Sequence, residues 1–375
     1  MNRLIHRLTA FFKKETVLCI AALLAFASAF FVRPSLAYVS YIDFRVLALL
    51  FCLMLVVSGL QNIGVFQTLA ASLLTGVKNT RQLVFLLTGL CFFSSMLITN
   101  DVSLITFVPF GIMVLDIAHL EKLYIPVIVL QTIAANLGSM FTPVGNPQNL
   151  YLYTAFSISM TDFLKVMFPL TSLSLLLMIL AVILLPNQAL TIEKTKKAAI
   201  TSKSKCMIYF SLFLVCLLCV VHIISFQWML VIAAAVVILT DRALFKNVDY
   251  SLLLTFVCFF IFIGNMEQIP AIADSLHRLI AGRELFLGIL LSQCISNVPA
   301  AMLLSGFTTK AVPLLYGVNI GGLGTLIASL ASLISYRYYA NIENAKKGKY
   351  MQTFTLYNVV FLILLVIAGV MILYL

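Results

Sequence analysis

The stretch FTPVGNPQNL, residues 141–150, decides the fold, because it places two prolines, a glycine and two asparagines inside a long apolar run. Each proline removes a helix hydrogen bond, and Gly145 allows a tight turn. Irregular backbone at membrane depth is tolerated only where protein buries it or where it lines a cavity. The stretch therefore predicts a broken transmembrane helix whose freed carbonyls, with the amides of Asn146, Gln148 and Asn149, are available to a ligand.

The composition indicates the class of protein. Of the 375 residues, 62% are hydrophobic and 10% are charged, whereas a soluble domain has about 45–50% apolar and about 25% charged residues. A polytopic membrane protein is therefore predicted. The 8 cysteines lie mostly in apolar runs, which favours packing over a metal or redox site. The net charge of +11 fits basic cytoplasmic loops better than nucleic-acid binding.

Apolar stretches of about 20 residues, long enough to span a membrane, occur along the whole chain. Two further apolar stretches are interrupted halfway, by ITND and by ISNVP, and a basic segment separates two halves. We divide the chain into four parts: a first span (1–35), a first repeat (36–186), a basic cytoplasmic linker (187–206) and a second half (207–375). The first repeat contains a hairpin (82–115) and a broken helix (123–158). The second half contains two spans and then a second repeat, with a hairpin (284–308) and a broken helix (310–335).

The basic residues predict the orientation in the membrane. With the N-terminus in the cytoplasm, the large majority of the 24 lysines and arginines fall in cytoplasmic loops, as the positive-inside rule requires. This count holds only if 82–115 and 284–308 do not cross. Both are therefore predicted to be re-entrant hairpins, one entering from each side, and the C-terminus is predicted to lie outside.

The two halves resemble each other. NLGSMFT at 136–142 matches NIGGLGT at 319–325, and each follows a hairpin tip that contains asparagine. Upstream, DFRVLALLF from Asp43 parallels DYSLLLTFV from Asp249. With opposite topologies from the charge count, these matches predict an inverted repeat, an architecture common among secondary transporters. The predicted fold class is an all-α polytopic membrane protein with two opposed re-entrant hairpins and two broken transmembrane helices.

The hairpin tips and the breaks form the predicted site. Helices are predicted to restart after Asn100 and after Asn297, and a helix N-terminus carries about half a unit of positive charge and unpaired N–H groups. Two such ends make an anion site without a buried lysine or arginine. The substrate-binding candidates are Thr99, Asn100, Ser296, Asn297, Asn146 and Thr325. The cation-coupling candidates, which with the tips would also hold a sodium ion, are Asp101, Gly138, Thr142, Gly145, Asn149, Gly321, Gly324 and Ser329.

Asp101 is a carboxylate at a hairpin tip, where an ionised group costs about 2.5–3.5 kcal/mol on membrane-insertion scales. Two roles remain open for it at this point. Aspartate is a good helix N-cap, and it is also a ligand for a cation or a proton. Capping does not exclude the ligand role.

At these positions the chain resembles the ion transporter superfamily, from about residue 40 onward, through ITND…FVP, GSMFTPVGNPQN, SNVP and GGLGT. Members include the citrate and dicarboxylate sodium symporters, the arsenite-pump membrane subunit and a sodium/proton antiporter family. In the symporters each tip carries Ser-Asn-Thr, which holds a substrate carboxylate and sodium. Here TND (99–101) and SNV (296–298) keep both asparagines but lack both final threonines, and the Asn-Asp pair is similar to the arsenite-pump and antiporter branches. The resemblance implies a homodimer with an elevator-like motion.

The sequence thus predicts a secondary active transporter that moves a small anion, a carboxylate or another oxyanion, across the plasma membrane and is coupled to sodium or protons. The alternative is a sodium/proton antiporter in which Asp101 carries the exchange. A membrane-embedded enzyme is a remote alternative, because one deep carboxylate has no partner base. We expect no enzymatic activity, no nucleic-acid binding and no cofactor beyond the coupling Na+ or H+. The expected partners are the anion, the lipid bilayer and a second copy of the chain.

Overall fold

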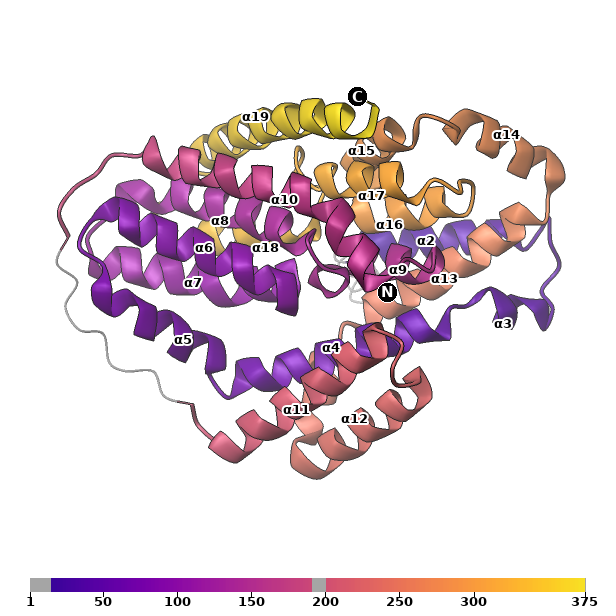
Figure 1. Ribbon diagram of the computed structural model, residues 1–375, viewed down its shortest axis with the longest axis horizontal. Helices are drawn as coiled ribbons and strands as arrows, with labels where there is room; N and C mark the ends of the chain where they lie inside the picture. The colour runs from indigo at the N-terminus through magenta and orange to yellow at the C-terminus, as the bar shows by residue number, and fades with distance from the viewer. Residues whose placement is uncertain (1–14, 191–199, 375) are drawn as a thin grey trace, which may run out of the picture.

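The computed structural model describes residues 15–190 and 200–374, and within those ranges it is built of helices without a β-strand (Figure 1). Seven helices in the described ranges are long and apolar enough to cross a membrane. Their bounds are Phe44–Asn62, Thr80–Ile98, Asn100–Ile117, Met160–Ile183, Lys203–Val220, Tyr250–Glu267 and Lys347–Tyr374. The protein is an all-α polytopic membrane protein, as its composition predicts.

The first half contains α2 (Thr16–Ser28), α3 (Ala37–Tyr41), α4 (Phe44–Asn62), α5 (Val65–Leu73), η1 (Leu74–Gly76), α6 (Thr80–Ile98), α7 (Asn100–Ile117), η2 (Glu121–Leu123), α8 (Tyr124–Ser139), η3 (Pro143–Gly145), α9 (Pro147–Ala155) and α10 (Met160–Ile183). The second half contains α11 (Lys203–Val220), α12 (Phe226–Thr240), η4 (Arg242–Asn247), α13 (Tyr250–Glu267), α14 (Pro270–Ile280), α15 (Glu284–Ile295), α16 (Asn297–Ser305), α17 (Ala311–Ile320), α18 (Leu330–Ala340) and α19 (Lys347–Tyr374).

Both hairpins turn at a residue with the same unusual backbone. Thr99, between α6 and α7, has φ 69° and ψ 150°, and Ser296, between α15 and α16, has φ 75° and ψ 155°. This region is otherwise occupied almost only by glycine, and a side chain there costs about 1–3 kcal/mol. Two strained residues at equivalent places show that the tips are built to one plan.

The breaks lie where the sequence predicts them. In the first half the helix stops at Ser139 and restarts at Pro147, with the short 3-10 helix η3 between. Asn146 caps the restart, since its Oδ1 accepts from the backbone N–H of Asn149 at 3.1 Å. In the second half the interruption runs from Gly321 to Ser329.

The matched aspartates of the two halves also play one role. Asp43 and Asp249 are the N-caps of α4 and α13, and their carboxylates accept from Val46 N at 3.0 Å and Leu252 N at 2.9 Å. Capping satisfies one of the backbone N–H groups that a helix start leaves unpaired. The parallel noted between these two segments in the sequence therefore reflects a shared local structure.

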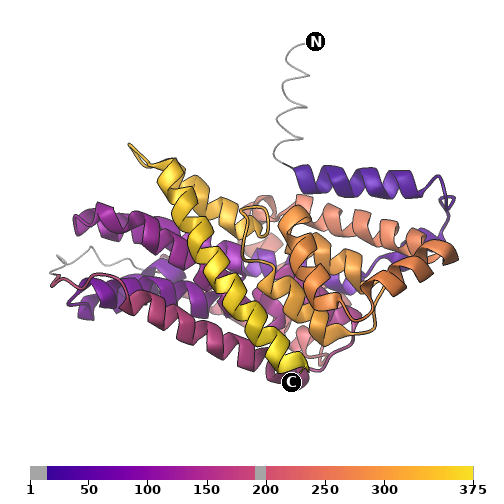
Figure 2. The ribbon, with the colours of Figure 1, turned by 90° about the horizontal axis from the view of Figure 1, so that it is seen from above.

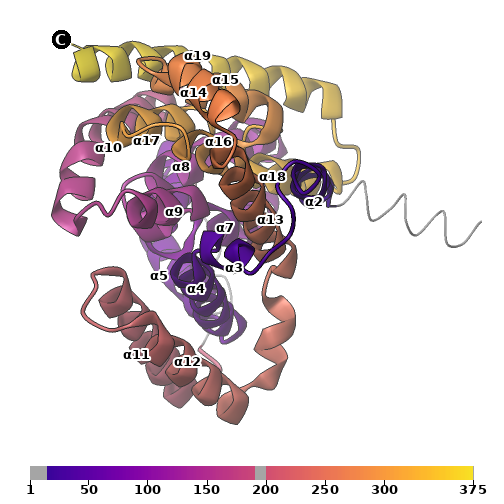
Figure 3. The ribbon, with the colours of Figure 1, turned by 90° about the vertical axis from the view of Figure 1, so that its right-hand side faces the viewer.

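The halves are interleaved rather than placed side by side as separate bundles. Helix α2 packs on α13 of the other half, while α11 and α12 pack on α4. Likewise α7 packs on α18, and α16 packs on α9. Figure 3 shows the α11–α12 pair lying beyond α4, and Figure 2 shows α19, in yellow, crossing the other helices diagonally. Each half therefore completes the core of the other.

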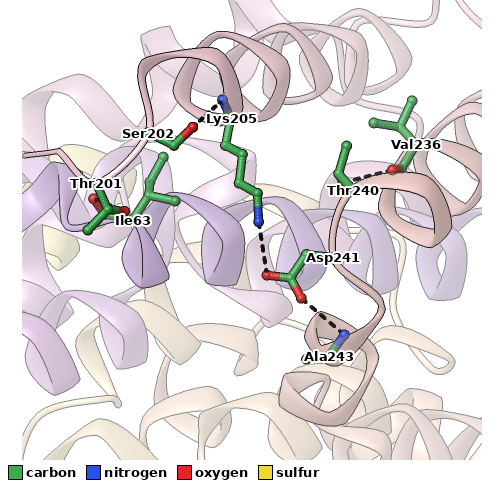
Figure 4. A network of polar contacts seen from close by, with 8 residues as sticks. All are labelled: Ile63, Thr201, Ser202, Lys205, Val236, Thr240, Asp241 and Ala243. Carbon is green, nitrogen blue, oxygen red and sulfur yellow. Dashed lines mark hydrogen bonds and ion pairs between the residues drawn. The ribbon is translucent and has the colours of Figure 1, made fainter.

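Polar contacts fix the start of α11 and the end of α12 (Figure 4). Lys205 Nζ lies 3.8 Å from Asp241 Oδ2, and the Ser202 hydroxyl accepts from the Lys205 backbone N–H at 3.3 Å. Because Ser202 is the N-cap, α11 begins at Lys203. This start lies inside residues 187–206, which were predicted from the sequence to form the linker. Thr201 N donates to the Ile63 carbonyl at 3.1 Å, which ties this start to the end of α4.

The two hairpins differ in the length of their arms. The arms α6 and α7 have 19 and 18 residues, long enough to cross, whereas α15 and α16 have 12 and 9. The first tip is nevertheless hydrogen-bonded to Asn136, close to the break. Beyond that break α9 continues for 9 residues, a helix length of about 14 Å. This geometry supports a tip that stops inside the membrane, and re-entrance itself stays a prediction.

Two short helices, α5 and α14, precede the hairpins and were not predicted. Helix α14 exposes most of its residues, including Asp274 and Arg278. Neither helix has the length of a span, so hydropathy over about 20 residues does not reveal them. They occupy the same place in both halves, immediately before the first hairpin arm.

Each broken helix packs closely on the first arm of its own hairpin through a glycine and a serine. A Cβ atom at Gly138 would overlap the Phe92 carbonyl and lie 2.7 Å from Ser95 Oγ, and one at Gly321 would lie 2.8 Å from Ser292 Oγ. Ser95 and Ser292 are both fully buried, four residues before their tips. The same approach therefore recurs in the two halves.

We expect Gly138→Ala to separate α8 from α6 and to lower the thermal unfolding temperature, because overpacking a tight contact costs about 1–3 kcal/mol. Gly89→Ala is the matched control on α6, since nothing lies within 4 Å of a Cβ built there. The control is expected to be neutral or slightly stabilising, by about 0.5–1 kcal/mol. Equal unfolding temperatures for the two variants in detergent would contradict the close approach.

Candidate functional site

One side-chain oxygen joins the first hairpin tip to both broken helices. Asn136 Oδ1 accepts from Asn100 Nδ2 at 3.0 Å and from Ser329 Oγ at 3.0 Å. Asn136 belongs to α8, Asn100 starts α7, and Ser329 is the N-cap of α18. All three are buried. The site therefore links residues that lie 193 positions apart in the chain.

The second tip reaches the same point from the other half. The Asn297 backbone N–H donates to the Ala328 carbonyl at 3.0 Å, and the Ser296 hydroxyl lies 3.4 Å from that oxygen. Ala328 directly precedes Ser329, which contacts Asn136. The second tip thus bonds directly to the residues that precede α18, and the first tip is joined to them through Asn136.

A second group of amides surrounds Asn319 of α17. Asn319 Nδ2 donates to Asn149 Oδ1 at 2.7 Å, and Asn319 Oδ1 accepts from Asn146 Nδ2 at 3.4 Å. Asn146 Nδ2 also donates to the Ser139 hydroxyl at 3.0 Å. This group ties the first break to the second half of the chain.

The two groups follow the sequence match between the halves. Asn136 and Asn319 are the matched asparagines, and each accepts from the N-cap side chain of the other half, Ser329 or Asn146. The matched threonines make the same kind of contact. The Thr142 hydroxyl donates to the Met96 carbonyl, and the Thr325 hydroxyl donates to the Gln293 carbonyl. The acceptor lies three residues before the tip in both cases.

Asp101 is the second residue of α7 and does not cap it. The N-cap is Thr99, and the Asp101 backbone N–H donates to the side chain of Asn100 at 3.0 Å. Asp101 Oδ1 is buried without a hydrogen-bond partner. An unpartnered buried carboxylate oxygen costs free energy unless a proton or a cation meets it. This arrangement favours the ligand role over the capping role.

Two buried donors in the same region also lack partners, Asn136 Nδ2 and Gln148 Nε2. No lysine or arginine takes part in the hydrogen bonds described for the two amide groups. In the described ranges there is also no cluster of three or more His, Cys, Asp or Glu side chains that could hold a metal. The site is therefore built from amides, hydroxyls and one carboxylate.

The other predicted residues are placed as follows. Gly145 needs to be glycine, because a Cβ would overlap the Ser139 carbonyl. Gly324 has φ 108°, which favours glycine. Thr325 is exposed and bonds to α15 rather than to either amide group, so it lies at the edge of the site.

Comparison with known proteins agrees with this arrangement. A family model described as a citrate transporter matches residues 5–308. The chain belongs to the citrate transporter family. It is a membrane transporter and not an enzyme, and the resemblance to the ion transporter superfamily is confirmed.

Curated relatives extend over most of the chain. It is 32% identical to the transporter MJ0456 of Methanocaldococcus jannaschii, over 87% of this chain and 89% of that one. It is 32% identical to the inner membrane protein YbiR of Escherichia coli, over 79% of this chain and 80% of that one. A shorter match, 35% identical over 36% of this chain and 27% of the relative, is to the silicon efflux transporter LSI3 of rice.

Sequence reasoning did not assign three residues that the site depends on. Asn136 and Asn319 served as landmarks of the repeat, and their recurrence at matched positions was the available signal. Gln293 was missed, although its amide makes three contacts of 2.9 Å with residues 321–325. A single glutamine in an apolar run gives no indication of its partner.

We expect Asn100→Ala and Asn297→Ala to reduce uptake by about tenfold or more, because losing a hydrogen bond to a buried group costs about 1–3 kcal/mol. The side-chain bonds lost are that of Asn100 to Asn136 at 3.0 Å and that of Asn297 from the Ser296 hydroxyl at 3.4 Å. Expression should be retained, since the backbone bond of Asn297 to Ala328 remains. Asn358→Ala is the control, because Asn358 is also buried but bonds only to Phe354 O within α19. Near-normal uptake by both tip variants in proteoliposomes would remove the tips from the mechanism.

Proposed function

We propose that the protein is a secondary active transporter that carries a small anion, a carboxylate or another oxyanion, across the plasma membrane with sodium or proton coupling. Both hairpin tips meet at residues 328–329, Asn297 directly and Asn100 through Asn136, and this meeting carries the proposal. A site whose elements come from both halves can move as one unit, as an elevator-like motion requires.

The donors at the site suit oxygen-rich anions. Helices α7 and α16 direct their N-termini at the tips, and helix N-termini attract negative charge. The unpartnered donors Asn136 Nδ2 and Gln148 Nε2 would be satisfied by substrate oxygens. The family's name, citrate transporter, supports a carboxylate. The rice relative is named a silicon efflux transporter, which is a reason to test other oxygen-rich solutes as well.

The matched tips, caps and cross-half hydrogen bonds support an inverted repeat. In this arrangement the N-terminus lies in the cytoplasm, the C-terminus lies outside, and the two hairpins enter from opposite sides. A homodimer with an elevator-like motion is part of the same proposal and rests on the family resemblance. Alternating access through such repeats is the usual mechanism of secondary transporters.

A sodium/proton antiporter is the second candidate, and Asp101 favours it. Its Oδ1 is a buried acceptor without a partner, at the start of a helix in the site. An ionisable residue inside a membrane protein marks an ion or proton pathway by default. In this candidate the exchanged ions would meet at Asp101 and no anion would be carried.

A proteoliposome experiment distinguishes the two candidates. Purified protein is reconstituted, and the uptake of citrate, dicarboxylates and oxyanions is measured with a sodium gradient and a proton gradient imposed separately. Gradient-driven uptake of one of these solutes supports the anion transporter. Sodium-driven proton movement in the absence of all of them supports the antiporter.

Asp101→Asn is expected to abolish proton-coupled movement and to flatten the pH dependence of transport if the protein is an antiporter. In an anion transporter, substrate binding should persist or improve, because a negative charge near the anion is removed, while cation coupling weakens. Binding and uptake are measured at several pH values with and without sodium. Asp274→Asn, on exposed α14, is the control, and unchanged coupling in Asp101→Asn would exclude the ligand role.

A single cysteine at Lys203 is expected to react only from the cytoplasm, and one at Arg278 only from outside. Both positions are exposed, at the start of α11 and near the end of α14. The native cysteines are first replaced, because Cys294 is itself exposed. Reaction of both introduced cysteines with an impermeant reagent from one side would contradict the inverted repeat.

A further inference from the structure

A side-chain amide occupies the group of carbonyls that the first break sets free. Asn149 Nδ2 lies 3.1 Å from Met140 O, 3.4 Å from Thr142 O and 3.5 Å from Ser139 O. These three carbonyls belong to the last residue of α8, Ser139, and to two residues just beyond it, where the helix no longer supplies partners. The Asn149 side chain is fully buried among them.

A different amide does the same at the second break. Gln293 Nε2 lies 2.9 Å from Gly321 O and 2.9 Å from Leu323 O, with Ile289 O at 3.3 Å. The other end of this amide is also used, since Gln293 Oε1 accepts from the Thr325 backbone N–H at 2.9 Å. Gln293 belongs to the hairpin arm α15, so it binds the hairpin to the interrupted segment.

Converging carbonyl oxygens are the ligands that hard cations prefer. An amide NH2 group carries partial positive charge and donates two hydrogen bonds. It can therefore stabilise the negatively polarised carbonyl oxygens as a cation would. The space between the carbonyls holds either the amide or an ion. In both halves the chain itself supplies the positively polarised group.

We propose that Asn149 and Gln293 fill the two positions in which a cation would otherwise stabilise the breaks. The broken helices are then held without a bound ion, and the cation dependence of transport rests on Asp101 alone. The assignment to Asp101 rests on the proposed function, whereas the filling of the two carbonyl groups does not. Thr142, Asn149 and Gly321 are accordingly removed from the predicted sodium ligands, because their carbonyl or amide groups take part in these contacts.

Thermal unfolding of purified Asp101→Asn protein tests the proposal without any transport measurement. Unfolding temperatures are compared in LiCl, NaCl, KCl and choline chloride at equal ionic strength. We expect them to coincide, because no cation position remains. A rise of about 2–4 °C or more that is specific to Na+ or Li+ would show a bound ion and overturn the proposal. Since this result does not depend on a substrate, its failure is distinguishable from failure of the proposed function.

Gln293→Glu tests the second position by replacing the amide donor with a carboxylate. At pH 8 the ionised side chain cannot donate to Gly321 O and Leu323 O, so the variant should unfold at a lower temperature in choline chloride and recover about 2–4 °C in NaCl. Gln352→Glu, on the exposed face of α19, is the control and should show no such recovery.

Identical cation responses of Gln293→Glu and the control would mean that the carbonyl group does not suit an ion, and would overturn the proposal. Asn149→Asp gives the same test at the first position. The Asp101→Asn comparison stands independently if either charged variant does not fold.

Discussion

Backbone groups inside a hydrocarbon layer must find partners within the protein, because no water is available to them. This chain interrupts four helical elements in its interior, at two tips and two breaks. Amide side chains supply the missing partners. Asn136 and Asn319 connect the halves to each other, while Asn149 and Gln293 bond to the freed carbonyls. The rest of the architecture depends on these contacts, because without them the breaks would not be tolerated.

The two halves share a plan but differ in detail, and the differences bear on function. The tips have the same strained backbone, yet Asp101 follows the first asparagine and Val298 follows the second. The amide at the first break comes from the broken helix itself, whereas Gln293 comes from the second hairpin. Moving that hairpin away from its break would therefore require the loss of several hydrogen bonds. Among the described residues, it is the first half that places a carboxylate, Asp101, beside the site.

The sequence predicts the interruptions well and their partners poorly. Proline, glycine and asparagine act on their own few residues, so the breaks at 142–149 and 321–329 and the tips at ITND and ISNV could be located. The residues that turn the chain, Thr99 and Ser296, were known only from the structure. The hydrogen bond between Asn136 and Ser329 spans 193 positions and has no local signature. The start of α11 at Lys203 is set by one N-cap residue, Ser202. This residue lies in a segment that was assigned to the linker because of its basic charge. A sequence shows which segments cannot satisfy themselves, but tertiary packing decides what satisfies them.

The interleaving of the halves has a consequence for biosynthesis. The surfaces of α4, α7 and α9 are covered by α11, α18 and α16, which the ribosome makes later. A nascent first half therefore holds uncovered polar tips and breaks in the membrane until most of the second half is inserted. Final packing is delayed until late in translation, and truncation within the second half would leave the entire protein unassembled rather than a stable first half.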